Sequence, residues 1–196
     1  MYIVLAAGAS SRMGREKLAA PLAGRSPLGR LANMLRDRTV LLIASRDKAY
    51  QYGQLMPAAT VLINENPANG MTSSLRVALS SIGDCERAGI VLADKPLLLR
   101  ATLEGLEAVA GATASDIVFP QSAGGEPGHP VYLSQRALAA VASLPDGDSL
   151  RALRSNPNLA ALAVPSEDPG AFIDVDTEED WQKAEAIARQ LDRSAV

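Results

Sequence analysis

The chain has 196 residues, of which 47% are hydrophobic and 21% charged, and its formal net charge is −3 at pH 7. This length suits one domain with a substantial core, and the mild acidity argues against a general nucleic-acid binder, which would carry a basic surface. The single cysteine, Cys85, excludes a disulfide within the chain and fits a reducing cytoplasm, and no apolar run approaches the roughly 18 residues of a membrane span.

Apolar runs alternate with amphipathic ones along the chain. The patterns predict strands over 2–7, 39–45, 60–64, 89–94, 116–120 and 129–134, and helices over 26–37, 70–82, 100–111, 134–144 and 177–192. Most of these strands are continuous apolar runs, which is typical of strands buried on both faces. The alternation therefore predicts a three-layer α/β fold with a mainly parallel sheet, in a single domain spanning 1–196.

The first predicted strand runs into a small and basic loop within VLAAGASSRMGREKL, residues 4–18. The loop contains two glycines and three cations, Gly8, Gly14, Arg12, Arg15 and Lys17. Glycines allow positive φ, and successive backbone N–H groups in such a loop form a concavity that binds anions. The loop lacks the GK[ST] ending of a P-loop and the GxGxxG spacing. It indicates a phosphate-binding loop, and a solvated turn is the alternative.

Ligands of open α/β sheets bind outside the carboxyl ends of the strands, and two stretches supply carboxylates there. Asp94 follows a predicted strand in ADKP, where it either binds a metal or caps the next helix, with Pro96 in the first turn. FIDVDT supplies Asp174 and Asp176, either as metal ligands or as caps of the last helix. Carboxylates that converge with a polyphosphate can hold Mg²⁺.

The stretch NENPANGMTSSLR places Gly70, Ser73 and Ser74 at the opening of a predicted helix. A helix N-terminus favours anions and polar ligand groups, and an ordinary serine cap is the alternative. His129, the only histidine, has no serine or cysteine partner in a triad pattern, so a structural role is expected for it.

Five motifs in this order resemble the MobA-like NTP transferase family, most closely its molybdenum cofactor cytidylyltransferase branch. They are LAAGASSRMGREKL, NPANGMTSSLRVAL, VLADKPLL, GHPVYL and IDVDTEEDW, and they span nearly the whole chain. The first follows the signature LAAG-x-S-x-R-M-G-x-x-K. The resemblance implies a Rossmann-like nucleotidyltransferase fold, an NTP substrate, Mg²⁺ as cofactor and a phosphorylated small-molecule acceptor. It implies no nucleic-acid or membrane partner, and it allows a contact with a molybdoenzyme or a chaperone.

The resemblance also implies roles in nucleotide binding. Four residues at the end of the first predicted strand would wrap the nucleobase and ribose, namely Leu5, Ala6, Ala7 and Gly8. Arg12 and Lys17 would contact the triphosphate, and Ser73 and Ser74 would line the base pocket. Ala7, where guanylyl-transferring relatives commonly have glycine, favours a pyrimidine and hence CTP.

The metal site implied by the resemblance consists of Asp94 with either Asp174 or Asp176 as the second carboxylate. The implied catalytic residues are Arg12, Lys17 and Asp94. The implied reaction transfers CMP from CTP to molybdopterin or the molybdenum cofactor and releases pyrophosphate. The acceptor phosphate is already anionic, so the attack needs no general base.

Three departures from the family pattern concern the acceptor and the site. Glu16 replaces a common proline, Lys95 replaces a common glutamine beside Asp94, and GDSLR at 147–151 replaces an acceptor-facing GDxGAR. Lys95 would either contact a phosphate or have no role. The alternatives are a guanylyltransferase of the same family, a sugar-nucleotide glycosyltransferase with DVD as its metal motif, and a nucleotide-binding protein without activity.

Overall fold

In the computed structural model, which describes residues 1–8 and 16–194, seven strands form one sheet in the order β3-β2-β1-β4-β6-β5-β7. The strands are β1 (Tyr2–Leu5), β2 (Val40–Ser45), β3 (Thr60–Asn64), β4 (Arg87–Leu92), β5 (Ile117–Gln121), β6 (Val131–Ser134) and β7 (Ala161–Pro165). Only β6 runs against its neighbours β4 and β5, and the other pairs are parallel. The predicted α/β fold with a mainly parallel sheet is confirmed.

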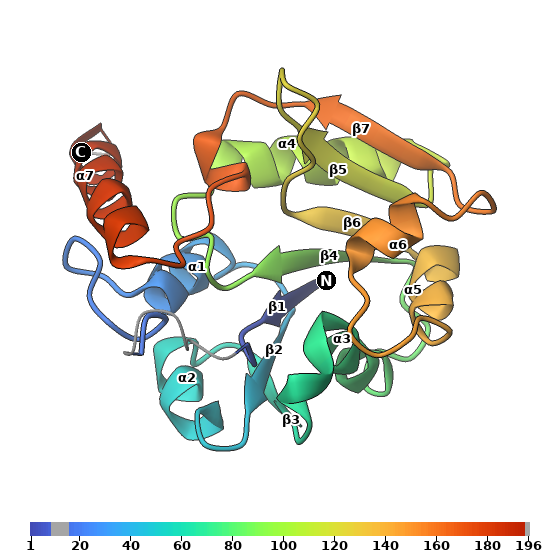
Figure 1. Ribbon diagram of the computed structural model, residues 1–196, viewed down its shortest axis with the longest axis horizontal. Coiled ribbons are helices and arrows are strands. Elements are labelled where there is room, and N and C mark those ends of the chain that lie inside the picture. Colours follow the sequence, from blue (N-terminus) through green and yellow to red (C-terminus); the bar gives the residue numbers. More distant parts are fainter. Residues whose placement is uncertain (9–15, 195–196) are drawn as a thin grey trace.

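Helices cover both faces of the sheet and give the predicted three layers (Figure 1). One face packs against α1 (Pro27–Met34), α2 (Ala49–Leu55) and α4 (Arg100–Ala112), and the other against α3 (Gly70–Leu79), α5 (Gln135–Val141) and α6 (Leu150–Arg154). Successive strand residues point to opposite faces. Val4 and Val91 accordingly lie in the first core, whereas Ile3 and Ile90 lie in the second.

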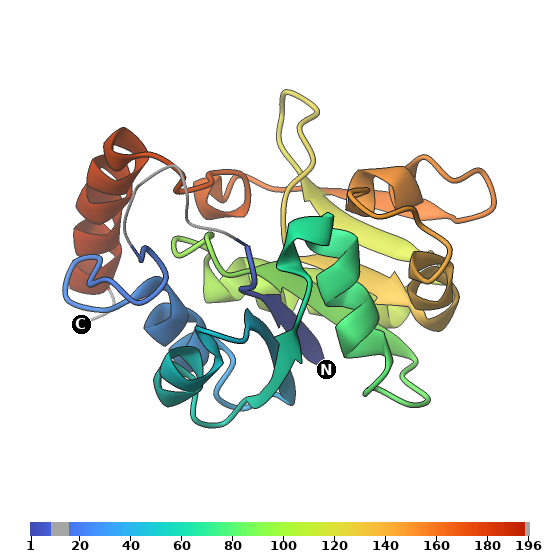
Figure 2. The ribbon, with the colours of Figure 1, turned by 60° about the horizontal axis from the view of Figure 1, so that its bottom comes forward.

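The last helix, α7 (Glu178–Ser194), lies at one end of the molecule, on the side toward which the arrow of β4 points (Figures 1 and 2). Trp181 and Ala184 of α7 form a third buried cluster with Leu22, Leu97 and Val175. This cluster ties α7 to the segment that follows the first loop. The C-terminal part of the chain is thereby fixed beside the carboxyl ends of the strands.

The structure differs from the sequence prediction in the short and half-buried elements. The predictions missed β7, α2 and α6, whose sequences are short and mix polar, glycine or proline residues with apolar ones. The predicted strand 2–7 ends at Leu5, and the predicted helix 70–82 ends at Leu79. Across the described residues, the helices are too short or too polar for a membrane crossing.

Candidate active site

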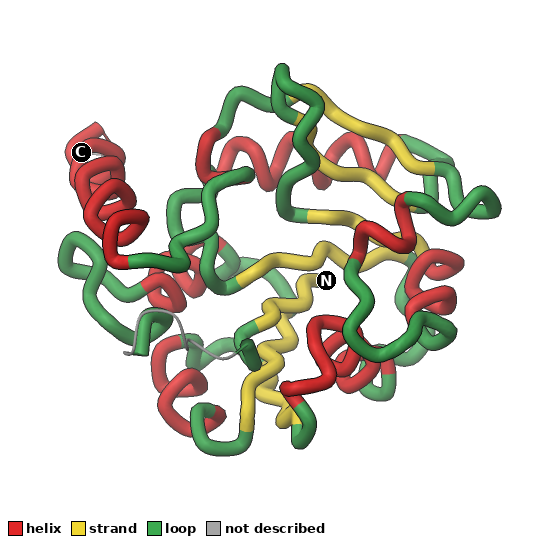
Figure 3. Tube along the Cα trace, viewed as in Figure 1, coloured by secondary structure: helices red, strands yellow, loops and turns green. Residues whose placement is uncertain are grey.

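The carboxyl ends of β1 and β4 bring the first loop and Asp94 to the same rim of the sheet. The two strands pair in parallel, with Leu5 opposite Leu92, and the Ala93 N–H donates to the Leu5 carbonyl at 3.1 Å. In Figure 3 the loop that follows β4 lies on the side of the molecule that carries α7. The rim is therefore where a ligand can meet groups from both halves of the chain.

The first loop leaves β1 through two buried alanines, Ala6 and Ala7. Gly8 is exposed, and a Cβ built on it would meet nothing within 4 Å among the described atoms. The predicted phosphate ligand Arg12 lies with the rest of 9–15 outside the described residues. The described start of the loop thus offers an accessible backbone next to the rim.

Lys17 joins this rim to the C-terminal part of the chain. Its Nζ donates to Oδ1 of Asp176 at 2.7 Å and to the Val175 carbonyl at 2.9 Å, and it lies 3.5 Å from Oδ2 of Asp94. Lys17 is only 8% exposed. The structure therefore brings the predicted phosphate-binding lysine together with two of the three predicted metal carboxylates.

Asp94 has one carboxylate oxygen that fits a cation. Its Oδ1 is buried and accepts no hydrogen bond from the described residues, an arrangement that is costly without a partner. Burial raises the pKa of Asp94, although the Lys17 ammonium opposes that shift. The capping alternative is wrong, because α4 begins only at Arg100 and the Leu99 N–H is taken by Oδ2 of Asp168 at 2.9 Å.

Close backbone packing places the DVD segment beside Asp94. Asp168 also accepts the Gly170 N–H at 2.8 Å, and a Cβ on Gly170 would lie 2.1 Å from the Leu97 carbonyl oxygen. Glycine is thus required for this close approach. Farther on, the Val175 N–H donates to the Asp94 carbonyl at 3.3 Å, so the segment runs directly alongside Asp94, just beyond the end of β4.

Lys95 and Asp174 form a second lysine–aspartate pair next to the first. Lys95 is 3% exposed, and its Nζ lies 2.7 Å from Oδ1 of Asp174, whose side chain is 53% exposed. From the sequence, Lys95 was expected either to contact a phosphate or to have no role. In the structure its partner is Asp174. Nothing in its own neighbourhood in the sequence indicates that this lysine is buried.

The start of α7 has a capping pair of its own. The Asp180 N–H donates to Oγ1 of Thr177 at 3.1 Å, and Oδ2 of Asp180 accepts the Thr177 N–H at 2.9 Å. This reciprocal pair is a capping box at the start of α7. Thr177 and Asp180 therefore supply capping contacts at the start of α7, and Asp174 pairs with Lys95.

The predicted base-pocket serines lie near the start of α3. Asn64, which is 2% exposed at the end of β3, donates through Nδ2 to Oγ of Ser73 at 2.8 Å and of Ser74 at 3.0 Å. The serine-cap alternative is wrong, because Asn69 occupies the cap position and both serines lie within the helix. Asn64 fixes the two hydroxyls, a role that the sequence reading missed.

The GDSLR segment packs against the same helix N-terminus. Oγ1 of Thr72 donates to the Asp148 carbonyl at 2.7 Å, and the Gly147 N–H donates to the Asn69 carbonyl at 3.0 Å. Gly70 has φ of +79°, and a Cβ on it would lie 3.2 Å from Cα of Gly147. The segment that the resemblance assigns to the acceptor therefore adjoins the predicted base pocket.

Glu16 ties the end of the first loop to α2. Its Oε1 accepts the Tyr52 hydroxyl at 2.6 Å and the Leu18 N–H at 3.0 Å, and its Oε2 lies 3.2 Å from Nζ of Lys48. These contacts fix the residue directly before Lys17. In the sequence, the only sign of these contacts is that Glu16 is an acidic residue within a basic loop.

His129 takes the structural place expected for it. Its Nδ1 lies 3.5 Å from the Ile90 carbonyl. Burial, reinforced by the nearby Lys95 ammonium, lowers the pKa of His129 to about 4. The imidazole is therefore neutral at pH 7.

Residues 1–8 and 16–194 contain no group of three or more His, Cys, Asp or Glu side chains placed to hold a metal ion. Mg²⁺ does not need such a cage, since it usually takes one or two carboxylates with phosphate oxygens and water. The Asp94–Asp176 pair meets that lower requirement.

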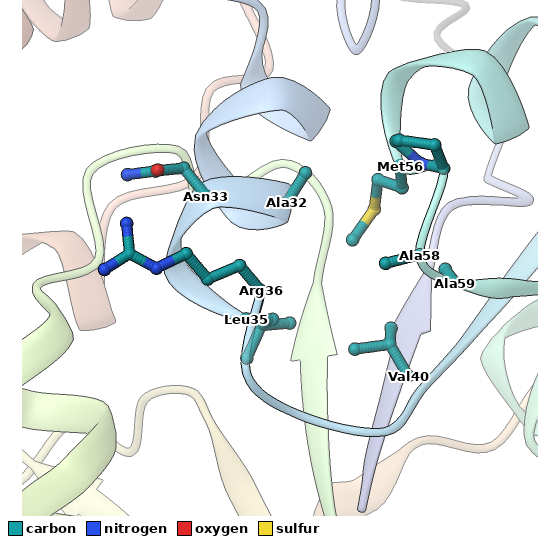
Figure 4. Close-up of a pocket in the computed structure, with 9 residues that line it drawn as sticks. Ala32, Asn33, Leu35, Arg36, Val40, Met56, Ala58 and Ala59 are labelled. Carbon is teal, nitrogen blue, oxygen red and sulfur yellow. The ribbon is translucent and has the colours of Figure 1, made fainter.

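A separate apolar cavity of about 280 Å³ lies between α1 and the end of α2 (Figure 4). Its lining includes Ala32, Leu35, Val40, Met56 and Ala59. Val40 begins β2, so the cavity lies at the amino end of that strand. None of its lining residues is acidic, and it is distinct from the rim that holds Lys17.

Comparisons with known proteins agree with this fold. A model described as the MobA-like NTP transferase domain matches residues 2–162. No curated protein matches the sequence significantly.

Solved structures resemble the chain over nearly its full length. Rv0371c from Mycobacterium tuberculosis H37Rv has a TM-score of 0.78 at 26% identity, covering 94% of this chain and 96% of that one. Its manganese complex has a TM-score of 0.74 at 25% identity, with 94% and 97% covered. Molybdopterin-guanine dinucleotide biosynthesis protein A from Archaeoglobus fulgidus has a TM-score of 0.77 at 18% identity, with 96% and 98% covered.

Proposed function

The chain belongs to the MobA-like NTP transferase family of nucleotidyltransferases, and from that premise we propose that it transfers CMP from CTP to a phosphorylated acceptor such as molybdopterin or the molybdenum cofactor. The whole chain acts as one domain, and Mg²⁺ is the cofactor. The observation that carries the proposal is the meeting of Lys17, Asp94 and Asp176 at the rim beside the first loop.

The proposed reaction is a displacement at phosphorus. An oxygen of the acceptor phosphate attacks the α-phosphorus of the nucleotide, and the bond from that phosphorus to the bridging oxygen breaks, so that pyrophosphate leaves with the electron pair. The acceptor phosphate is already an anion, so no base has to remove a proton. Catalysis then depends on positioning and on neutralising charge, which suits a rim with lysines and carboxylates.

Lys17 and the acidic residues have different roles in positioning the nucleotide and neutralising its charge. The Lys17 ammonium binds the triphosphate as a point charge at the end of a long stem. Asp94 and Asp176 would hold Mg²⁺, which supplies charge neutralisation at the phosphate oxygens. The buried Oδ1 of Asp94 supports this assignment. Asp176 suits the second position better than Asp174, because Asp174 pairs with Lys95 instead of sharing Lys17 with Asp94.

Nucleobase recognition is assigned to residues 5–8 and to the start of α3. Ser73 and Ser74 have their hydroxyls fixed by Asn64, and fixed polar groups discriminate between ligands better than mobile ones. The choice of CTP rests on Ala7. The manganese complex of Rv0371c supports a divalent cation in a structure of the same fold.

Pyrophosphate release is the direct test. CTP, GTP, ATP and UTP are each incubated with the protein, Mg²⁺ and a molybdopterin-type acceptor, and nucleotide competition is measured by displacement of labelled CTP. We expect release with CTP that requires the acceptor. A clear GTP preference would assign the protein to guanylyl transfer. If the protein binds nucleotide but releases no pyrophosphate with any acceptor tested, it is a nucleotide-binding protein without activity. Transfer of a sugar from a sugar nucleotide would identify a glycosyltransferase.

A further inference from the structure

The Lys17 ammonium occupies the position between the two carboxylates that are best placed for a divalent cation. It contacts Oδ1 of Asp176 at 2.7 Å and Oδ2 of Asp94 at 3.5 Å. We propose that Lys17 and the divalent cation compete for these carboxylates, so that tight cation binding requires a nucleotide to draw Lys17 away. This inference rests on the proposed function and adds a binding order to it.

The competition follows from charge and space. An ammonium and a divalent ion held by the same two carboxylates would lie a few ångströms apart, and at that separation their repulsion is large wherever water is largely excluded. Lys17 is 8% exposed and also donates to the Val175 carbonyl at 2.9 Å. The lysine is therefore held in place by three groups, and a cation must displace it to gain both carboxylates.

A nucleotide triphosphate offers Lys17 an alternative partner. Its phosphates carry several negative charges, and the lysine stem is flexible enough to turn from the carboxylates to a phosphate beside Gly8. The move leaves Asp94 and Asp176 to the cation. Because coupling between two ligands is reciprocal, the nucleotide raises the affinity for the cation by the same factor as the cation raises the affinity for the nucleotide.

The chain contains a matched control for this competition. Lys95 is another buried lysine, 3% exposed, but it pairs with Asp174 at 2.7 Å. Replacement of either lysine with methionine removes one positive charge near the same group of aspartates and keeps a long side chain. Only the Lys17 replacement removes the ammonium that bridges Asp94 and Asp176.

The test is Mn²⁺ binding without nucleotide, measured by electron paramagnetic resonance of the free ion. We expect Lys17→Met to bind Mn²⁺ about tenfold more tightly than the unmodified protein, or better, since a hydrogen bond to a charged group contributes at least that factor. Lys95→Met should change the affinity by less than about threefold. Equal gains in both variants would show a general charge effect and overturn the proposal, as would an unchanged or weakened affinity in Lys17→Met.

A second measurement uses the unmodified chain and does not depend on how the variants fold. Acetylation of Lys17 by an amine-reactive reagent, followed by mass spectrometry, should accelerate when saturating Mn²⁺ is added, with Lys95 as the internal reference. An unchanged rate at saturating Mn²⁺ would overturn the proposal. Both measurements omit the acceptor and turnover, so a failed pyrophosphate assay refutes the proposed function without altering their outcome.

Discussion

Replacement of Asp94 with asparagine separates structure from catalysis at this site. The change removes one negative charge and keeps the shape of the side chain. Lys17 loses the longest of its three contacts, at 3.5 Å, and keeps Asp176 and the Val175 carbonyl. The change also relieves the burial of a charge, the cause that raises the pKa of Asp94. These effects oppose one another, so we expect the free energy of unfolding to change by no more than about 1 kcal/mol.

Turnover should respond quite differently to Asp94→Asn. The affinity of a carboxylate site for Mg²⁺ depends on its charge. Loss of one preorganised partner for developing charge typically costs about 2.7–4 kcal/mol in the transition state, which lowers turnover about 100- to 1,000-fold. The Mg²⁺ concentration needed for half-maximal pyrophosphate release should rise as well.

Thermal melting and pyrophosphate release against Mg²⁺ concentration, measured on one preparation, test both expectations. Asp116→Asn is the control. Asp116 is another buried aspartate, which lies just before β5 and accepts hydrogen bonds from Ser134 and the Ala160 N–H, so its replacement should lower the melting temperature and leave the Mg²⁺ dependence unchanged. An Asp94→Asn protein that turns over at the normal rate at every Mg²⁺ concentration would refute the catalytic assignment.

Three further predictions concern the surroundings of the site. The pKa of His129 is about 4 in the folded chain, so between about pH 6.5 and pH 4 the unfolded chain binds a proton there and the folded chain does not. Lowering the pH through this range should therefore lower the free energy of unfolding by about 3 kcal/mol. Thermal melts at several pH values should show that His129→Asn lacks this pH dependence. Tyr52→Phe removes the 2.6 Å bond to Glu16 and should weaken labelled-CTP binding, whereas Tyr50→Phe, at a side chain 80% exposed, should not. Asn64→Ala removes the amide that contacts both serine hydroxyls, of which Ser73 keeps its bonds to backbone carbonyls. It should narrow the affinity difference between CTP and GTP, as measured by competition, and an unchanged CTP-to-GTP affinity ratio would show that Asn64 has no part in base selection.

The layered fold could be predicted because its signals are local. The continuous apolar runs of β1, β2 and β4 identify strands buried on both faces, and the 3.6-residue spacing in α3 and α4 identifies helices. β7 escaped prediction because its residues are mostly half-buried or exposed and end at a proline. Its membership in the sheet is fixed by pairing with β5 rather than by its own pattern.

The candidate site was predictable in its residue types and not in its pairings. A strand that ends in aspartate and a basic loop after β1 both point to one rim. Which aspartate shares Lys17 depends on how η2 (Pro169–Ala171) packs on Leu97 through Gly170, and this contact joins residues more than 70 positions apart. The burial of Lys95 depends on Asp174 in the same way. The capping alternative for Asp94 failed because Asp168 serves the start of α4 instead, and the start of α7 carries the Thr177–Asp180 pair.

The bridge from Lys17 to Asp176 also has a consequence for synthesis. The two residues are 159 positions apart, and a chain emerges from the ribosome N-terminus first, at roughly 5–20 residues per second. The lysine and the first strands are exposed to the cell while Asp176 has not yet been translated. A nascent chain that has just completed β7 possesses every strand of the sheet and lacks the residue that seats Lys17. Asp176 therefore becomes available to Lys17 only after all seven strands have been translated, and the contact between the two residues is among the last that the folding chain can make.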